Sequence, residues 1–220
     1  MIKKNTLTLH SLSVSKDSRT LISVDTEVKP GSITTIMGPS GIGKSLLLAA
    51  IAGVLPATFT QNGSVCYDGA ELTALPAHKR RLGILFQDPL LFEHMNVAQN
   101  IMFGMPQNEL SKQQRADTLL ADVGLQGYGQ RAVQALSGGQ QARVALLRTL
   151  ASAPRAVLLD EPFSKLDMQT RHQTRCWVFD NIRQQGLPCI MVTHDEDDAL
   201  DAQGPVITIT QPEQDTDKLC

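Results

Sequence analysis

The pattern of apolar and polar residues divides the first third of the chain into strands and one helix. Apolar residues alternate with polar ones over residues 6–14 and 21–28, which is typical of strands with one buried face. An unbroken apolar run over residues 33–37 predicts a strand buried on both faces. A helix is expected to begin at Lys44, because strong helix formers follow it until Gly53. Further short strands are expected around Val65 and Tyr67 and over residues 82–86.

The middle of the chain, roughly residues 88–135, has a different pattern. Gln, Asn and Met are more frequent there, and the stretch "SKQQRADTLLADVGL" has helical spacing, which predicts an inserted helical subdomain. The last third is expected to contain strands over residues 156–161, 189–194 and 205–210 and a helix over about 168–184. Because these apolar strand segments do not alternate, they predict an α/β fold with a mainly parallel sheet covered by helices on both faces.

Composition narrows the classes of function. Charged residues make up 19% of the 220 residues, the formal net charge is -2, and the longest basic cluster is residues 79–81, so a nucleic-acid partner is not expected. The apolar run over residues 46–55 is too short to cross a bilayer, and the first ten residues resemble a strand rather than a signal peptide. The four cysteines have no metal-ligand spacing and are expected to be thiols in a reducing cytosol; they are Cys66, Cys176, Cys189 and Cys220.

The stretch "GPSGIGKS" at residues 38–45 follows an apolar strand and opens a helix, and it matches a phosphate-binding loop. Backbone N–H groups of such a loop point at the phosphates, and the helix dipole favours an anion there. Lys44 adds a positive charge for the outer phosphates, and Ser45 can place its hydroxyl on a magnesium ion. The residues expected to bind the nucleotide are Gly38, Pro39, Ser40, Gly41, Ile42, Gly43, Lys44, Ser45 and Leu46.

Polar residues follow the apolar strands that would lie beside this loop. In "AVLLDE", Asp160 and Glu161 are neighbours whose side chains diverge in an extended chain, so one can face a metal ion and the other an attacking water. A capping role for Asp160 and a solvated acid at Glu161 are the alternatives. Gln87 and His194 also follow apolar strands and would reach the same sheet edge, although a histidine at a strand end is often just an exposed loop residue. The acidic run after His194 is interpreted as a helix N-terminus rather than a metal site.

A second glycine-rich turn, "LSGGQ" at residues 136–140, precedes the helical run "QARVALLR". Its free N–H groups could bind a phosphate, although residues 38–45 already supply one complete phosphate site. A helix start capped by Ser137 is the alternative interpretation, but it does not explain Gly138 together with Gly139.

Taken in order, these motifs resemble the nucleotide-binding subunit of an ATP-binding cassette (ABC) transporter, and the resemblance covers nearly the whole chain. The matching pieces are residues 38–45, Gln87, "LSGGQ", "LLDEP" at 158–162, "SKLD" at 164–167 and His194. The pairing of LSGGQ with an Asp-Glu strand end shortly after it is highly specific to that family. The resemblance implies one ABC ATPase domain over residues 1–220, with a P-loop NTPase core, N-terminal antiparallel strands and the inserted helical subdomain at about residues 88–135.

In this family two subunits lie head to tail, so the resemblance implies a second copy of the chain as partner and ATP with Mg²⁺ as cofactors. The signature turn of one subunit would complete the nucleotide site of the other, through Ser137, Gly138, Gly139 and Gln140. Lys44 and Ser45 would hold phosphates and magnesium, with Asp160 supporting the ion.

The remaining catalytic roles also follow from the resemblance. Glu161 would be the general base. Gln87 and His194 would sense the γ-phosphate, with Gln87 also a metal ligand, and Asp167 would communicate between the two sites.

Three departures from the family pattern stand out. No aromatic residue precedes Phe59, so the usual stacking platform for adenine is missing near the N-terminus. Leu46 replaces the usual hydroxyl residue after Lys-Ser, and Lys165 stands where a small residue is common.

The segment over residues 84–101 resembles the part of importer cassettes that forms a groove for a short permease helix. The chain also ends soon after its last strand, so it resembles a compact cassette without a C-terminal regulatory domain. The expected partners are integral membrane permease subunits and, indirectly, a periplasmic substrate-binding protein, which places the chain at the cytoplasmic face of the inner membrane. The alternatives are a soluble ATP-binding regulator with little turnover and the ATPase of an export or lipoprotein-release system.

Overall fold

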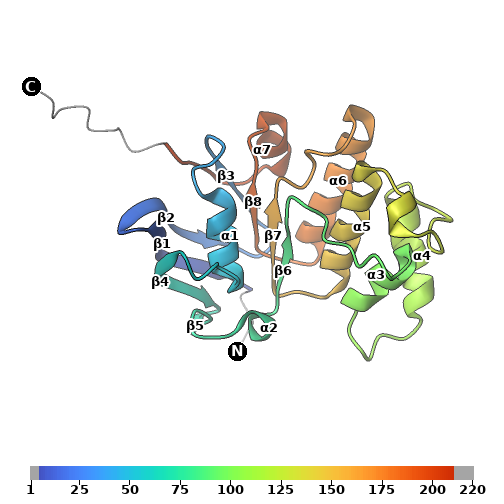
Figure 1. Cartoon of the computed structure of the whole chain (residues 1–220), viewed down its shortest axis with the longest axis horizontal. Coiled ribbons are helices and arrows are strands. Elements are labelled where there is room, and N and C mark those ends of the chain that lie inside the picture. Colours follow the sequence, from blue (N-terminus) through green and yellow to red (C-terminus); the bar gives the residue numbers. More distant parts are fainter. Residues whose placement is uncertain (1–4, 211–220) are drawn as a thin grey trace, which may run out of the picture.

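The computed structural model describes residues 5–210 and contains two sheets (Figure 1). The first sheet is antiparallel, in the order β2-β1-β4-β5, and its strands are β1 (Leu7–Lys16), β2 (Arg19–Val28), β4 (Thr60–Tyr67) and β5 (Ala70–Glu71). The second is parallel, in the order β6-β7-β8-β3-β9, and its strands are β3 (Ile33–Met37), β6 (Leu82–Leu85), β7 (Ala156–Asp160), β8 (Cys189–Val192) and β9 (Val206–Thr208). The expected α/β class with a mainly parallel sheet is confirmed.

Helices fill three regions around these sheets. The helix α1 (Lys44–Ala52) lies between the two sheets, whereas α5 (Gly138–Ala151) and α6 (Met168–Gln184) lie on the other side of the parallel sheet (Figure 1). The remaining helical elements are α2 (Ala77–Arg80), α3 (Val97–Gly104), α4 (Lys112–Asp122), the 3-10 helix η1 (Val133–Ala135) and α7 (Glu196–Ala202).

Alternate residues of the central parallel strands enter different cores. On β7, Leu158 packs with α1 and the antiparallel sheet, while Val157 and Leu159 pack with α5 and α6. On β8, Ile190 and Met191 divide in the same way. Because both faces are covered by apolar layers, the strand sequence shows an unbroken apolar run instead of alternation.

Residues 88–135 contain α3, α4 and η1, together with one isolated β-bridge between Asn96 and Ala132. Their apolar residues form a third core with α5, which includes Val97, Leu120 and Val133 on this segment and Leu147 on α5. The core of the segment therefore depends on α5, and the boundaries of a helical subdomain remain a prediction.

Several expected strands end earlier than the apolar pattern does. The strands expected over residues 82–86, 156–161 and 189–194 end at Leu85, Asp160 and Val192, and the strand expected over 205–210 is limited to Val206–Thr208. The chain leaves β7 because Glu161 has a left-handed backbone, with φ 46°. The helix expected over about 168–184 is confirmed at Met168–Gln184.

Arg80 on α2 is buried, and it fixes the far end of α1. Its guanidinium donates hydrogen bonds to the carbonyls of Ala50 and Ile51 at 2.8 and 2.7 Å, and to those of Thr73 and Leu75 at 2.7 and 2.9 Å. Two of these carbonyls belong to the last turn of α1; that of Ala50 also accepts from the Gly53 N–H at 3.1 Å. Arg80, which in the sequence is only one member of the longest basic cluster, therefore caps the end of α1.

Among residues 5–210 we find no helix with both the length and the apolar character that crossing a bilayer requires. Cys66, Cys176 and Cys189 are free thiols, and burial raises the pKa of the Cys189 thiol well above its usual value. Cys220 lies outside the described residues.

Candidate functional site

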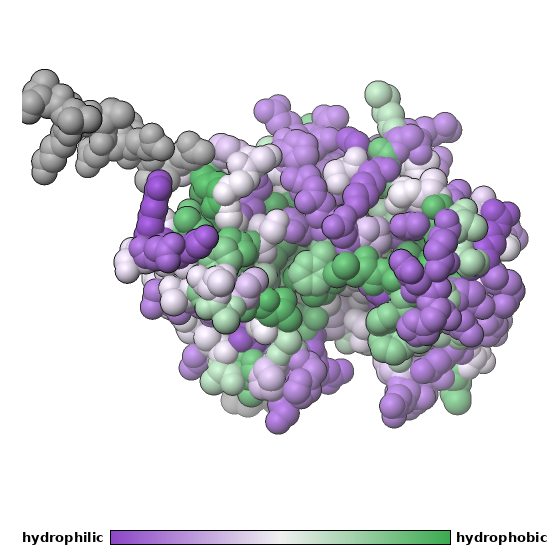
Figure 2. Space-filling model, viewed as in Figure 1, coloured by the Kyte–Doolittle hydropathy of each residue, from purple (hydrophilic) through white to green (hydrophobic). Residues whose placement is uncertain are grey.

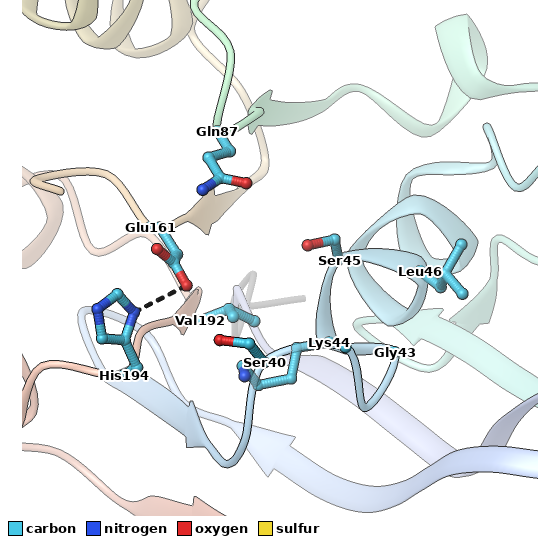
Figure 3. Close-up of a pocket in the computed structure, with 10 residues that line it drawn as sticks. Ser40, Gly43, Lys44, Ser45, Leu46, Gln87, Glu161, Val192 and His194 are labelled. Atoms are coloured by element: carbon cyan, nitrogen blue, oxygen red, sulfur yellow. Dashed lines mark hydrogen bonds and ion pairs between the residues drawn. The ribbon is translucent and has the colours of Figure 1, made fainter. Parts of the chain in front are cut away.

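A pocket of about 460 Å³ opens at the carboxyl ends of the parallel strands (Figure 3). The loop after β3, the N-terminus of α1 and the segments after β6, β7 and β8 all contribute to it, as expected for ligand sites of open α/β sheets. Its lining residues are Ser40, Gly41, Gly43, Lys44, Ser45, Leu46, Gln87, Glu161, Val192 and His194. The structure thus brings the glycine loop together with three of the four polar residues expected after the strands, namely Gln87, Glu161 and His194.

The glycine loop reaches its shape through left-handed residues. Gly41 and Gly43 have φ angles of 82° and 99°, a region that side chains with a Cβ rarely adopt. Gly43 is also the N-cap of α1 and offers no side chain to cap the helix. The first N–H groups of α1 therefore have no side-chain acceptor at the cap and can bind an anion in the pocket.

The ammonium group of Lys44 is held against the loop backbone. Its Nζ donates to the carbonyl oxygens of Gly38 and Pro39 at 2.6 and 2.9 Å. Lys44 is buried, yet it also lines the pocket, so the loop fixes a positive charge where a phosphate would sit. Ile42 is buried on the protein side of the same loop.

Asp160 lies behind the pocket, at the end of β7, and does not line it. Burial raises the pKa of Asp160, and the neighbouring charge of Glu161 raises it further, whereas a hydrogen bond from the Ser45 side chain and the charge of Lys44 lower it. A buried carboxylate beside a hydroxyl suits a hard cation that takes its other ligands from phosphates and water. Among residues 5–210 no group of three or more His, Cys, Asp or Glu side chains could hold a metal ion alone.

Glu161 and His194 both line the pocket and contact each other on one side of it. The His194 Nδ1 lies 2.9 Å from Oε1 of Glu161, and the two side chains are 59% and 15% exposed respectively (Figure 3). The N–H of Glu161 donates to the carbonyl of Val192 at 2.9 Å, which fixes the left-handed turn at this position. Gln87 comes from the segment after β6 and lies near Glu161 in Figure 3.

Ion pairs support the segment that carries His194. Arg171 on α6 contacts Asp195 at 2.8 Å and also donates to the carbonyl of Leu166 at 3.2 Å. One helical turn further along α6, Arg175 contacts Asp198 at 2.8 Å. The Thr193 hydroxyl donates to the same carboxylate at 3.0 Å. The acidic run after His194 is therefore the start of α7 tied to α6, which sequence reasoning recognised only as a helix N-terminus.

The signature turn lies outside the pocket of its own chain. Ser137 and Gln140 form a reciprocal capping box at the start of α5: the Ser137 hydroxyl accepts from the Gln140 N–H, and the Gln140 side chain accepts from the Ser137 N–H. No residue from 136 to 140 is among the described residues that line the pocket. The helix-cap interpretation therefore accounts for Ser137 and Gln140 within one chain.

The two glycines of the turn differ. A Cβ at Gly139 would approach the carbonyl oxygen of Lys165 to 3.0 Å, so packing explains a glycine there. A Cβ at Gly138 would meet no atom of its own chain within 4 Å. Asp167, a candidate for communication between sites, caps α6 by accepting from the Thr170 N–H at 3.0 Å, and this hydrogen bond is the main reason that the pKa of Asp167 is lowered.

The departures from the family pattern have visible consequences. Leu46 lines the pocket, where it presents methyl groups instead of a hydroxyl. Lys165 forms an ion pair with Asp88 at 2.8 Å. Val192 also lines the pocket, and no sequence signal singled it out because it is one apolar residue in a buried strand.

Known proteins resemble this chain over most of its length. The uncharacterized ABC transporter ATP-binding protein YnjD of Escherichia coli (strain K12) is 40% identical over 205 residues, which are 92% of this chain and 94% of YnjD. The Fe(3+) ions import ATP-binding protein FbpC 2 of Pectobacterium atrosepticum is 42% identical over 93% of this chain. The sulfate/thiosulfate import ATP-binding protein CysA of Nephroselmis olivacea is 39% identical over 88% of it. The chain covers only 60% and 56% of these two import proteins.

A solved structure has the same fold. It is the dimeric structure of a post-hydrolysis state of the ATP-binding cassette MJ0796 bound to ADP and Pi, and it matches with a TM-score of 0.79 and 26% identity over 92% of this chain and 94% of that one. The family described as ABC transporter matches residues 21–164. Together with the phosphate pocket, these similarities show that the chain belongs to the ABC transporter family, as an ATP-binding subunit with ATPase activity.

Proposed function

We propose that this subunit hydrolyses ATP with magnesium as a head-to-tail dimer and thereby powers solute import through an integral membrane permease. The observation that carries the proposal is that the phosphate pocket and the signature turn of one chain lie apart from each other. Each chain has a phosphate pocket with Glu161 and His194 in contact, while none of the signature residues 136–140 is among the described residues that line it.

Within each pocket, the chain's own residues would divide the chemistry. Lys44 and the N–H groups at the start of α1 bind the phosphates. Ser45, Gln87 and Asp160 would hold Mg²⁺. When bound, the ion would neutralise part of the negative charge of the phosphates. Glu161 accepts the proton of the attacking water, and His194 orients the Glu161 carboxylate through the 2.9 Å contact.

A second copy of the chain would complete the pocket through residues 137–140. The helix α5 begins at the exposed Gly138, so its first N–H groups would be available to a partner's phosphates. Gly138 supports this arrangement, because nothing in its own chain requires a glycine there. MJ0796, which is similar in structure, forms a dimer bound to ADP and Pi. The pairing would be isologous, with each chain giving the same surface.

An apolar groove next to the segment from β6 to α3 fits a permease helix. Its volume is about 430 Å³, and its walls include Ile84, Leu90, Phe92, Phe103 and Arg148. Leu90 and Phe103 are 60% and 61% exposed. Figure 2, viewed as Figure 1, shows hydrophobic residues gathered across the middle of the face turned to the viewer. Exposed apolar side chains around a groove are typical of protein interaction sites.

Import is the proposed direction because FbpC 2 and CysA are import ATP-binding proteins. The chain would then lie at the cytoplasmic face of the inner membrane, with a periplasmic substrate-binding protein as an indirect partner. Reconstitution of the chain in vesicles with the membrane protein encoded beside its gene tests the direction. Solute should accumulate on the side of the membrane that carries the cassette, and movement away from that side would establish an exporter.

The Glu161→Gln variant tests the ATPase dimer. We expect ATP turnover to fall by about 100-fold or more, since the general base is lost while the phosphate contacts remain. With ATP and magnesium, the variant should form a stable dimer in analytical ultracentrifugation. Glu71→Gln, which changes an exposed acid on β5, is the matched control and should behave as the wild type. A Glu161→Gln protein that binds ATP and stays monomeric with its permease would contradict the head-to-tail dimer.

A further inference from the structure

Lys165 connects two loops of the site through its side chain. Its Nζ lies 2.8 Å from Oδ1 of Asp88, and the two side chains are 35% and 82% exposed. Asp88 directly follows Gln87, which lines the pocket. The ion pair therefore joins the segment after β6 to the segment after β7, at a position 77 residues away in the sequence.

The backbone of Lys165 connects the same segment to two further parts of the site. Its carbonyl lies under Gly139, 3.0 Å from the place where a Cβ would be, so the start of α5 rests on it. One residue earlier, Ser164 donates from both its N–H and its hydroxyl to the carbonyl of Glu161, at 3.3 and 2.9 Å. Lys165 thus stands between the proposed general base, the signature turn and the Gln87 loop.

Gln87 and Asp88 are consecutive residues in the bend that follows β6, so the peptide unit between them couples the directions of their side chains. Asp88 points outward to Lys165, and Gln87 faces the pocket. A contact that holds Asp88 on the outer side therefore also limits the directions that Gln87 can take.

We propose that Lys165 is a positioning residue, which orients Gln87 toward the pocket through its ion pair with Asp88 and so raises the rate of ATP turnover. The inference rests on the proposed ATPase mechanism and deepens it. An exposed ion pair adds little to the stability of a fold, so its effect is on the population of one loop orientation and is limited to a few-fold.

A double-mutant cycle on the full chain tests the proposal. Lys165→Ala and Asp88→Ala should each lower kcat at saturating ATP by about two- to fivefold, while KM for ATP stays unchanged because the phosphate contacts are intact. The double alanine variant should be no slower than either single variant, since both remove one contact. The exchanged pair, Asp88→Lys with Lys165→Asp, should restore most of kcat.

Salt provides a second measurement on the same proteins. The difference in kcat between the wild type and Lys165→Ala should shrink in about 1 M salt, where the Debye length is about 3 Å. Glu109 and Arg115 form a matched control ion pair, also 2.8 Å long and partly exposed, in the segment around α4. The exchange Glu109→Arg with Arg115→Glu should leave kcat unchanged at both salt concentrations.

The outcomes separate this proposal from the ATPase mechanism itself. Turnover by the wild type tests the mechanism, whereas only the differences among the variants test the ion pair. Lys165→Ala can be made in the wild type and in the Asp88→Ala variant. If it lowers kcat by the same factor in both, Lys165 does not act through Asp88 and the proposal is wrong. Failure of the exchanged pair to restore kcat, in a protein with wild-type melting temperature, would also overturn it.

Discussion

His194 Nδ1 lies 2.9 Å from Oε1 of Glu161, although the two residues are 33 positions apart. Their segments leave the adjacent parallel strands β7 and β8 at the same sheet edge, so the pairing of the strands determines the contact. The left-handed turn at Glu161 directs its carboxylate into the pocket rather than along the strand. This contact is the basis of the first prediction.

Replacement of His194 by Ala should lower kcat by about 100-fold, because the Glu161 carboxylate loses the group that orients it. KM for ATP should change little, since Lys44 and the helix N-terminus still bind the phosphates. Steady-state ATPase assays over a range of ATP concentrations measure both constants. His10→Ala, at an exposed position on β1, is the control. A His194→Ala enzyme with near wild-type kcat would show that Glu161 is oriented by another group.

The two signature glycines should respond differently to alanine. Gly138→Ala is expected to leave the free energy of unfolding unchanged or to raise it by about 0.5–1 kcal/mol, because a Cβ there meets nothing in its own chain. ATP turnover should nevertheless fall at least tenfold if a partner's phosphates approach this backbone. Gly139→Ala should lower stability as well, since its Cβ would press on the Lys165 carbonyl. Urea unfolding and ATPase assays separate the two effects, and full activity in Gly138→Ala would argue against a signature turn acting on the partner.

Asp160→Asn should make the nucleotide-free chain more stable at neutral pH while abolishing ATP turnover. Burial is the main cause of the raised pKa of Asp160 in the folded chain. The folded state therefore binds the proton more tightly than the unfolded state, and wild-type stability falls as pH rises from the unfolded pKa of about 3.9 through the raised folded pKa. Asn cannot titrate, so the stability advantage of the variant should grow over that window and level off above the folded pKa. Urea unfolding at several pH values measures it, and a constant difference would contradict the raised pKa.

Arg80→Ala should lower the free energy of unfolding by about 3 kcal/mol, because four carbonyls lose a charged donor and the large buried side chain is removed. Lys79→Ala, at the exposed neighbouring position, should change it by less than about 0.5 kcal/mol. Chemical denaturation followed by circular dichroism measures both variants. Equal effects at the two positions would mean that Arg80 does not cap α1.

Phe103→Glu should break binding to the permease without changing the ATPase rate of the isolated subunit. Phe103 is 61% exposed on the wall of the groove, so a charge there opposes an apolar helix without disturbing the core. Leu110→Glu is the control, because Leu110 is 86% exposed outside this groove. Co-purification with the permease and transport in vesicles measure the effect. Normal docking of Phe103→Glu would place the permease contact elsewhere.

Local pattern alone predicted much of this fold. The unbroken apolar runs over β7 and β8 predicted buried parallel strands, and α6 begins and ends at the residues expected for it. These features are readable because side-chain periodicity depends on backbone geometry and on which faces are buried. The glycine loop and the polar residues at the strand ends were also visible, since each follows from a local motif.

Contacts between distant segments were not readable in the same way. Arg80 looked like part of a basic cluster, yet four carbonyls from separate segments converge on it. Lys165 was only an unusual residue until the fold brought it to Asp88, and Val192 is one apolar strand residue among many.

The sequence by itself determined which residues could carry the chemistry, because Gly, Lys, Ser, Asp and Glu at these spacings have few other local uses. Only the tertiary structure decided which of them meet, since strand order and helix packing set distances between residues far apart in the chain. It brought Glu161 to His194 and left the signature turn outside the pocket of its own chain. The physical reason is that a side chain's partners depend on the whole packed arrangement, whereas its periodicity depends on its neighbours alone.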